Sequence, residues 1–500
     1  MGVVAAEVNS SSSGFKACLA GPYVLATLLV SLPASDPDAT MTTLPLAPAF
    51  AADDLLHRSA LEQARLIRER QITSTELVQR YLERIEAHNA QLQAFVSVFE
   101  REALRAAKRA DRAVLAGAAL GPFHGVPTAM KDHHMMRNAR TQLGSRAFRW
   151  LWSPVDDSVV RRMRAAGFVL LGKTAMSELG MLPITETALQ PPTRNPWNLN
   201  HTAGGSSGGA GAAIAAGLLP IAPGSDGAGS VRIPASLNGL IGHKPTRGLV
   251  PDDAARIDPF GMVSIGPLAR SIDDAAALLD VLAAPGMQHH LERSKQPVRR
   301  LKIGIIMSPP HGALDPRIEA LVRRVAIALE RAGHQLVELE RPRGNIEEFI
   351  PIYQKLISRI PVIGRGQLQP VVRWFWEAGR TVSEEDARRR FLHFEALGIE
   401  MMSSVDVILS PTVGVLPFRV GEFASLPPAE LFHAVAPLGA FTVIANLSGQ
   451  PALTIPCGEV DGLPVGVQLG GRRHEDAFLL ALAREVQSLL QGGGTPDAIA

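Results

Sequence analysis

Cysteine is nearly absent from this 500-residue chain, which contains only Cys18 and Cys457. Two residues so far apart in the sequence form neither the clustered spacing of a metal site nor the framework of a disulfide-rich fold. Cys457 lies in the apolar run LTIPCG, so we expect it to be an inert residue of the core. We therefore expect no metal ion and no structural disulfide.

The chain also lacks an excess of charge of either sign. Its 50 lysines and arginines face 48 aspartates and glutamates, which gives a formal net charge of +2. Such a balance predicts no electrostatic attraction to nucleic acid or to acidic lipid. We therefore expect no nucleic-acid partner.

No apolar run is long enough to span a bilayer. The run from Gly21 to Leu32 has about the length of a signal-peptide core, but only Lys16 precedes it as a positive charge. Met41 offers an alternative start. We expect residues 1–50 to form a leader that is either disordered or a signal peptide. The first case predicts a cytoplasmic protein and the second a periplasmic or secreted one, and neither predicts a stable membrane anchor.

Helical and strand patterns alternate in the rest of the chain, which begins near Leu55. Residues 73–76 read TSTE, a capping box that predicts the start of a helix. FVSV at 95–98 and FVLL at 168–171 are short apolar runs typical of strands. The repeated alternation of helices with apolar strands predicts an α/β layer structure. The sequence has no internal repeats.

The most informative stretch covers residues 204–245. It contains two serine sites flanked by glycine, Ser206-Ser207 and Ser230, and an Ala/Ile-rich run between them that predicts a buried helix. Glycine allows the backbone to approach a ligand closely and leaves N–H groups free as donors. A serine on such a backbone can attack a carbonyl carbon while nearby N–H groups hold the oxyanion.

A nucleophilic serine needs a base, and the sequence offers two kinds of candidate, a histidine and a lysine. Residues 205–209 match G-x-S-x-G, the nucleophile elbow of α/β-hydrolases, whose histidine would be one of those downstream (His243, His334 or His474). The other candidate is Lys131, which ends the apolar segment VPTAM. Burial can lower the pKa of a lysine from about 10.4 by as much as about 3–5 units, and an exposed lysine would keep its ordinary value.

Several motifs, taken in order, resemble the amidase signature family. They are GVPTAMKD at 125–132, GGSSGG at 204–209, SDGAGSVRIPA at 225–235 and GHKPTRG at 242–248. ANLSGQPALTIP at 445–456 and DGLPVGVQLGG at 461–471 are similar to further segments of the family, so the resemblance covers about residues 55–490. The segment 176–198 is similar to bacterial amidases of the 6-aminohexanoate cyclic dimer hydrolase type.

The resemblance implies a fold and a reaction. The fold is a single α/β/α catalytic domain over residues 55–490, with a mixed, mostly parallel sheet covered by helices on both faces, followed by a tail at 491–500. The reaction is hydrolysis of a small carboxylic amide to an acid and an amine or ammonia, without a metal or organic cofactor. A homodimer and ester hydrolysis stay open.

The resemblance also implies a Ser-cisSer-Lys triad. Ser230 would be the nucleophile, Ser206 a bridging serine on a cis peptide bond, and Lys131 the neutral base. The remaining implied residues are the oxyanion hole, formed by the N–H groups of Gly227, Ala228, Gly229 and Ser230, and the supporting side chains Ser207, Asp226 and Arg232. We expect Asp226 and Arg232 to form a salt bridge that holds the nucleophile turn.

One position departs from the family pattern, since many members have glycine where this chain has Ala228. If that position required a positive φ, alanine would cost roughly 1 kcal/mol there. A catalytically silent binding protein built on the same fold is the alternative that rests on this change. Ile233 stands where the tRNA amidotransferase subunit usually has glutamine, so we do not expect that role.

Two further groups have open interpretations. We expect His133 and His134 to line a pocket or lie at the surface rather than to act in catalysis. The aromatic patch Trp374-Phe375-Trp376 is compatible with an acyl pocket and equally with core packing.

Overall fold

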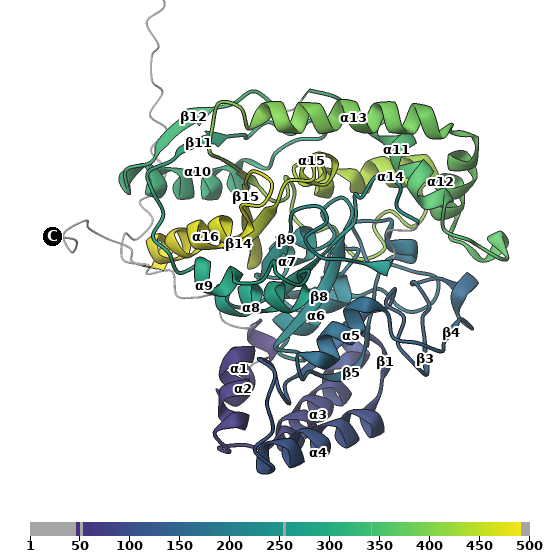
Figure 1. The fold of residues 1–500 in the computed structure, drawn as a ribbon. Coiled ribbons are helices and arrows are strands. Elements are labelled where there is room, and N and C mark those ends of the chain that lie inside the picture. Colours follow the sequence, from purple (N-terminus) through teal and green to yellow (C-terminus); the bar gives the residue numbers. More distant parts are fainter. Residues whose placement is uncertain (1–46, 51–53, 254–256, 342, 492–500) are drawn as a thin grey trace, which may run out of the picture. The chain divides into compact units, whose positions relative to one another are not determined.

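The structure, a computed structural model, describes residues 47–50, 54–253, 257–341 and 343–491 (Figure 1). The predicted leader, apart from residues 47–50, lies outside the described residues, as does the predicted tail after Gln491. None of the helices in the described part of the chain combines the length and apolar character that a membrane span requires.

The largest sheet has eight strands in the order β12-β11-β13-β15-β14-β9-β10-β8. Only the pairs β11–β12 and β11–β13 are parallel, and the other five neighbouring pairs are antiparallel. The strands are β8 (Ile221–Asp226), β9 (Ile241–Lys244), β10 (Ser264–Ala269), β11 (Lys302–Ile305), β12 (Gln335–Glu338), β13 (Val407–Pro411), β14 (Ala452–Val460) and β15 (Leu463–Gly470).

The predicted mixed α/β fold is confirmed, but the expectation of a mostly parallel sheet is wrong. Parallel neighbours need a long crossover connection, whereas antiparallel neighbours can follow one another through a tight turn. Strands β14 and β15 are joined by Asp461-Gly462, whose φ angles of 53° and 72° both lie in the left-handed region. This Asp-Gly pair is the turn that favours a hairpin.

A second sheet of three strands holds the base candidate. Its order is β1 (Phe95–Val98), β5 (Val169–Thr174) and β2 (Pro127–Lys131). The hydroxyl of Thr128 in β2 donates to the carbonyl of Ile221 in β8 at 2.8 Å, so the two sheets meet along these strands. Lys131 ends β2 and Asp226 ends β8, which brings the two predicted site segments to one edge.

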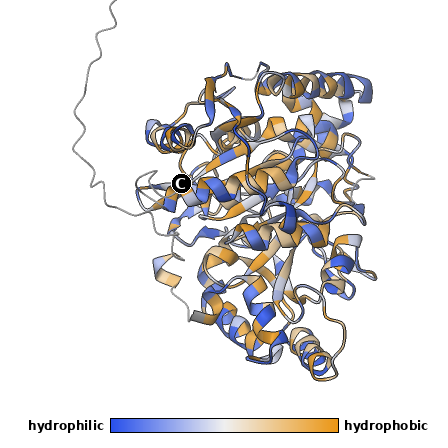
Figure 2. Ribbon diagram, turned by 60° about the vertical axis from the view of Figure 1, so that its left-hand side comes forward, coloured by the Kyte–Doolittle hydropathy of each residue, from blue (hydrophilic) through white to orange (hydrophobic). Residues whose placement is uncertain are grey.

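Helices surround the sheets, and many of the outer ones carry hydrophilic as well as hydrophobic residues (Figure 2). The predicted capping box is confirmed, because Thr73 accepts from the N–H of Glu76 and Glu76 accepts from the N–H of Thr73. Helices α8, α10 and α16 contact the large sheet, and α16 also contacts the helices α8 and α10. Helix α7 contacts the strands β9, β14 and β15.

The helices have the following bounds: α1 (Asp54–His57), α2 (Ala60–Arg68), α3 (Ser74–Leu92), α4 (Glu100–Leu115), α5 (Ser158–Ala165), α6 (Gly208–Ala215), α7 (Arg232–Leu237), α8 (Ile272–Leu282), α9 (His290–Arg293), α10 (Pro316–Arg331), α11 (Ile346–Ser358), α12 (Pro370–Thr381), α13 (Glu384–Met401), α14 (Pro428–Val435), α15 (Val443–Ser448) and α16 (Asp476–Gln491). Short 3-10 helices are η1 (Pro48–Phe50), η2 (Arg146–Phe148), η3 (Glu178–Gly180), η5 (Arg365–Gln367) and η6 (Ala436–Gly439), and two-stranded sheets are formed by β3 (Ala139–Arg140) with β4 (Trp152–Ser153) and by β6 (Arg194–Asn195) with β7 (Asn198–Thr202).

The aromatic patch on α12 packs in a core formed largely by α11, α12, α13 and α14. Phe375 is fully buried, with its ring centroid 4.6 Å from that of Phe432 and 5.9 Å from that of Tyr353. The indole N–H of Trp376 donates to the carbonyl of Ile360 at 3.0 Å. Core packing is therefore the role of this patch.

Candidate active site

Lys131 is fully buried and surrounded by serines. Its Nζ lies 2.7 Å from Oγ of Ser206, 2.8 Å from Oγ of Ser207 and 2.8 Å from Oγ of Ser225. The carbonyl of Ser225 lies at 3.4 Å from the same nitrogen. Hydroxyl groups can both donate and accept, so this shell can accommodate the ammonium form or the neutral amine.

Burial lowers the pKa of Lys131 to about 7, against a smaller opposing attraction from Asp226. A second buried lysine, Lys244, also has its pKa lowered to about 7, by burial and by the nearby Arg232. The Nζ of Lys244, however, donates to the carbonyl of Pro245 at 2.6 Å. The serine neighbours, rather than the lowered pKa alone, therefore distinguish Lys131.

The two serine sites lie side by side. The peptide bond between Gly205 and Ser206 is cis, as the resemblance implies. The N–H of Ser207 donates to the carbonyl of Ser230 at 3.2 Å. Among the described residues, no hydrogen bond joins Oγ of Ser206 to Oγ of Ser230.

A buried ion pair holds the turn that carries Ser230. Arg232 donates from Nε and Nη2 to the two carboxylate oxygens of Asp226 at 3.0 and 2.9 Å. Burial alone would raise the pKa of Asp226, but Arg232, aided by Lys244 and Asn446, holds it well below its ordinary value. Asp226 therefore stays ionised beside Arg232, and the geometry is that of the expected salt bridge.

The same carboxylate engages one of the predicted oxyanion donors. The N–H of Gly229 donates to Oδ1 of Asp226 at 2.7 Å, because the turn folds back on the aspartate three residues earlier. This geometry contradicts the prediction that the Gly229 N–H points to the oxyanion. Gly227, Ala228 and Ser230 stay as predicted donors.

The departure at Ala228 needs no strained backbone. Ala228 is not among the residues with positive φ, whereas Gly229 has φ of 124°. A Cβ atom on Gly229 would lie 2.2 Å from Oγ1 of Thr442. The position that requires glycine is thus 229, and the chain has glycine there.

Gly229→Ala is therefore expected to lower kcat by about 100-fold or more, because it displaces the turn that carries the predicted donors Ala228 and Ser230, and the loss of one oxyanion donor has an effect of that size. The added methyl group would overlap Oγ1 of Thr442, so the turn must move away from Thr442 to make room for it. Steady-state kinetics on any amide that turns over provides the measurement. Ala228→Gly, which adds no atom, should lose far less; equal losses in the two variants would contradict this account of the turn.

Ser230 opens onto a cavity of about 850 Å³, a volume that includes its open mouth. The serine is 8% exposed, and its hydroxyl has no hydrogen-bond partner among the described residues. The walls are mainly apolar and aromatic, formed by residues such as Met181, Ile233, Tyr353, Phe432 and Leu447. Such a cavity suits a small molecule with an apolar part next to the reacting serine.

Of the two adjacent histidines, His134 has a structural partner, whereas neither ring nitrogen of His133 has a hydrogen-bond partner among the described residues. His134 is fully buried, and its Nδ1 lies 2.9 Å from Oδ2 of Asp157, so the expectation that it lines a pocket or the surface is wrong. His133 is half-buried with both ring nitrogens buried, and it is not among the residues that line the cavity.

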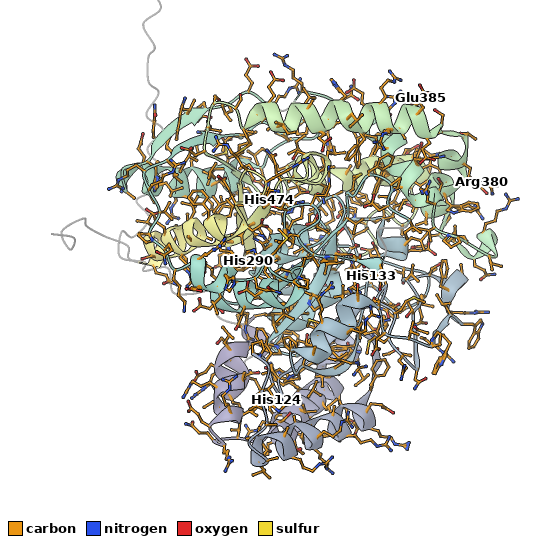
Figure 3. The ribbon with its side chains drawn as sticks, in the orientation of Figure 1. His124, His133, His290, Arg380, Glu385 and His474 are labelled. Atoms are coloured by element: carbon orange, nitrogen blue, oxygen red, sulfur yellow. The ribbon has the colours of Figure 1, made fainter. Side chains whose placement is uncertain are left out.

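The α/β-hydrolase interpretation is wrong, because the Ser206 and Ser207 hydroxyls contact Lys131 rather than a histidine. His243 is buried against Asp476 at 3.0 Å, and His334 lies 3.1 Å from Glu485. His474 is exposed and lies between β15 and α16 (Figure 3).

Four polar residues at the site were not predicted. Ser225 contacts Lys131 directly. Thr442 accepts from Arg232 through its carbonyl at 2.9 Å and donates from its hydroxyl to the carbonyl of Ala228 at 2.7 Å. The side-chain oxygens of Asn446 and Gln468 each accept from Arg232 at 2.7 Å. Asn446 and Gln468 lie in segments that carry the family resemblance, but no local pattern marks their contacts.

Known proteins are similar to this chain over most of its length. A family model described as Amidase matches residues 76–480. The chain belongs to the amidase signature family. Enzymes of this family hydrolyse amides, so the protein is an amidase, a hydrolase that acts on carbon–nitrogen bonds.

Similarity extends to relatives of several activities. One relative is the glutamyl-tRNA(Gln) amidotransferase subunit of Moorella thermoacetica, which is 32% identical to the amidase over 481 residues that cover 86% of this chain and 96% of the relative. The structure of 6-aminohexanoate cyclic dimer hydrolase superposes with a TM-score of 0.79 at 30% identity, covering 88% of this chain and 97% of that one. A bacterial aryl acylamidase gives a TM-score of 0.78 at 26% identity, with 88% and 99% covered.

Proposed function

We propose that this amidase hydrolyses small carboxylic amides through an acyl-enzyme on Ser230, with Ser206 and Lys131 moving the protons. The observation that carries the proposal is the 2.7 Å contact between Nζ of Lys131 and Oγ of Ser206, deep in the protein beside the Ser230 turn. A lysine with a pKa of about 7 is neutral in a large fraction of molecules at neutral pH and can then accept a proton.

In the acylation step, Oγ of Ser230 attacks the amide carbon and forms the new C–O bond. Its proton passes to Oγ of Ser206, whose own proton passes to Nζ of Lys131. The negative charge on the former carbonyl oxygen is held by the N–H groups predicted at Gly227, Ala228 and Ser230. When the C–N bond breaks, the proton returns through Ser206 to the leaving nitrogen, and an amine or ammonia departs.

In the second half, water attacks the acyl carbon and gives its proton to Ser206 and Lys131 in the same way. Breaking the C–O bond to Ser230 releases the acid, and the serine recovers its proton. The relay requires Ser230 and Ser206 to come within hydrogen-bond distance. A small side-chain rotation on substrate binding would supply this contact, as catalytic hydrogen bonds often tighten only in the substrate complex.

Some relatives bear on the substrate and partners. The amidotransferase relative is matched over 96% of its length, but Ile233, which lines the cavity of this chain, stands where the family resemblance leads us to expect glutamine in that subunit. We therefore propose a free-standing amidase. Its cytoplasmic location and a homodimer stay predictions, and so do the limits 55–490 of the catalytic domain.

The test is release of ammonia or amine from a panel of aliphatic, aromatic and cyclic amides. Ser230→Ala is expected to lower kcat by about 10⁴-fold or more, because the covalent route is lost. A fluorophosphonate should label Ser230 in the wild type and leave the variant unlabelled. Turnover that survives in Ser230→Ala would refute the acyl-enzyme, and a protein that neither turns over any amide nor takes the label would be the silent binding protein.

A further inference from the structure

The surface between residues 135 and 155 combines exposed apolar side chains with uncompensated positive charge. Five of the thirteen large hydrophobic side chains that are exposed in the described residues lie in this short segment. They are Met135 (37% exposed), Trp150 (69%), Leu151 (37%), Trp152 (56%) and Val155 (50%). A soluble protein rarely gathers so many such side chains at one place unless the patch meets another surface.

The same segment contains four arginines and no acidic residue. Arg137, Arg140, Arg146 and Arg149 are all exposed, and within the described residues none of them forms an ion pair with a carboxylate. Of the two acids that follow, Asp156 pairs with Arg164 and also accepts from the backbone N–H of Arg137 at 2.8 Å, and Asp157 pairs with the buried His134. The four guanidinium groups of this surface are therefore not paired with a carboxylate.

An aromatic ring, rather than an acid, holds two of these arginines. The guanidinium carbon of Arg140 lies 4.8 Å from the ring centroid of Trp150, and that of Arg149 lies at 5.4 Å. A cation placed over an indole face is attracted to it while its charge stays available to a partner. Trp150 thus fixes charge and apolar surface next to each other.

The backbone beneath the patch is well anchored. Strands β3 and β4 form a hairpin at the edge of the fold (Figure 1), supported by the N–H of Thr141, which donates to the carbonyl of Leu151 at 2.9 Å. Phe148 of η2 packs against the aromatic core. The exposed side chains therefore project from backbone that is held by hydrogen bonds and by packing.

We propose that this surface, which we call the Arg–Trp surface, docks the amidase reversibly on an anionic lipid bilayer. Indole rings favour the boundary between headgroups and acyl chains, and aliphatic side chains beside them add buried apolar area. Arginines near an anionic membrane each contribute about 1 kcal/mol of attraction, about fivefold in binding. Stacking on nucleic-acid bases would use the arginines and indoles but would leave Met135, Leu151 and Val155 without apolar partners.

This inference is independent of the amide chemistry, because none of the residues of the Arg–Trp surface lies at the serines or Lys131. It also refines the expectation from net charge. A total of +2 averages over the whole chain and hides a local group of four arginines without acids. A reversible contact of this kind is compatible with the prediction that the chain has no stable anchor.

The experiment is co-sedimentation of the full chain with vesicles of phosphatidylcholine alone and of phosphatidylcholine with 30% phosphatidylglycerol (about one lipid in three, enough for a strong surface potential). The wild type is expected to bind the anionic vesicles and to be released by salt. Two variants remove the two components separately: Arg137→Gln/Arg140→Gln/Arg146→Gln/Arg149→Gln, and Trp150→Ser/Trp152→Ser. We expect each to lower the partition coefficient at least about tenfold.

Helix α4 offers a matched control, because it also carries four exposed arginines (Arg101, Arg105, Arg109 and Arg112). Replacing these by glutamine removes the same charge from a surface with acids of its own and should lower binding no more than about threefold. Circular dichroism and thermal melting check that every variant is folded.

Four results would overturn the proposal. The first is no binding of wild type to anionic vesicles, and the second is an equal loss from the α4 set, which would indicate attraction by overall charge alone. The third is an oligomer, seen by light scattering, that dissociates in Trp150→Ser/Trp152→Ser, while neither the wild type nor this variant binds vesicles. This result would make the surface a contact between copies of the chain. The fourth is binding to a single-stranded oligonucleotide without binding to vesicles, which would make the partner of this surface a nucleic acid.

Discussion

Lys131→Met is expected to lower kcat/KM for an amide by about 10⁴-fold or more while leaving the protein folded, because removal of a base that works as a unit with its nucleophile is that costly. Methionine approximates the length of lysine and fills the same buried space, and the three serine hydroxyls around it are small enough to reorient toward one another. The three serines around Nζ lose their common partner. Initial rates and circular dichroism on the same preparation provide the measurement.

The pH dependence of the wild type gives an independent check on the same role. A base must be unprotonated, so kcat/KM should be low on the acid side and rise through the pKa of Lys131, which burial lowers to about 7. A rise centred near the ordinary lysine value, or a flat profile between pH 5 and 10, would count against Lys131 (the ordinary value being about 10.4). His474→Asn, a change at an exposed residue of positive φ, is the matched control and should leave the profile in place.

Asp226→Asn is expected to lower the free energy of unfolding by about 3–5 kcal/mol, because it leaves the fully buried guanidinium of Arg232 without its counter-charge. The change also weakens the acceptor for the Gly229 N–H, so activity should fall with stability. Urea unfolding followed by circular dichroism measures the first effect, and the kinetic assay on the folded fraction measures the second.

Asp461→Asn serves as the comparison for that substitution. Asp461 forms an ion pair with Arg317 at 2.8 Å, but its side chain is 66% exposed, and asparagine tolerates its φ of 53°. Exposed pairs of this kind are worth about 0–1 kcal/mol. A similar loss of unfolding free energy in the two variants would mean that burial does not make the loss of the Asp226 ion pair more costly than the loss of an exposed one.

Local motifs explain what could be predicted from the sequence. The capping box from Thr73 to Glu76 needs only neighbouring residues, and it is present. The placement of Lys131 beside Ser206 followed from motifs that travel together in a family, and the structure brings the two atoms into contact. In both cases the information lies within a short window or in a recognised combination of windows.

What could not be predicted depends on partners distant in the sequence. The direction of β15 relative to β13 is fixed by pairing between residues such as Ser410 and Gln468, which no local pattern specifies. The burial of His134 depends on Asp157, and the hold of Arg232 on the site depends on Asn446. The N–H of Gly229 donates to the carboxylate of Asp226, a contact that the residue types alone do not specify, and it therefore leaves the predicted oxyanion hole.

The hairpin of β14 and β15 is an intermediate case. Its Asp461-Gly462 turn is a strong local signal for antiparallel neighbours. This turn signal predicts that the two strands it joins are antiparallel, which differs from the expectation of a mostly parallel sheet. The remaining antiparallel pairs, such as β9 with β10, have no such marker.

The shell of serines around Lys131 has a consequence for how the charge of the site can change. As an ammonium group, the lysine has three hydrogens for three hydroxyl oxygens, all within 2.8 Å. As an amine, it has two hydrogens and a lone pair, so one hydroxyl must turn its own hydrogen toward the nitrogen. That turn is a rotation about a single C–O bond and moves no heavier atom. The buried site can thus exchange a proton without repacking its surroundings, and the rigid core around it is no obstacle to chemistry.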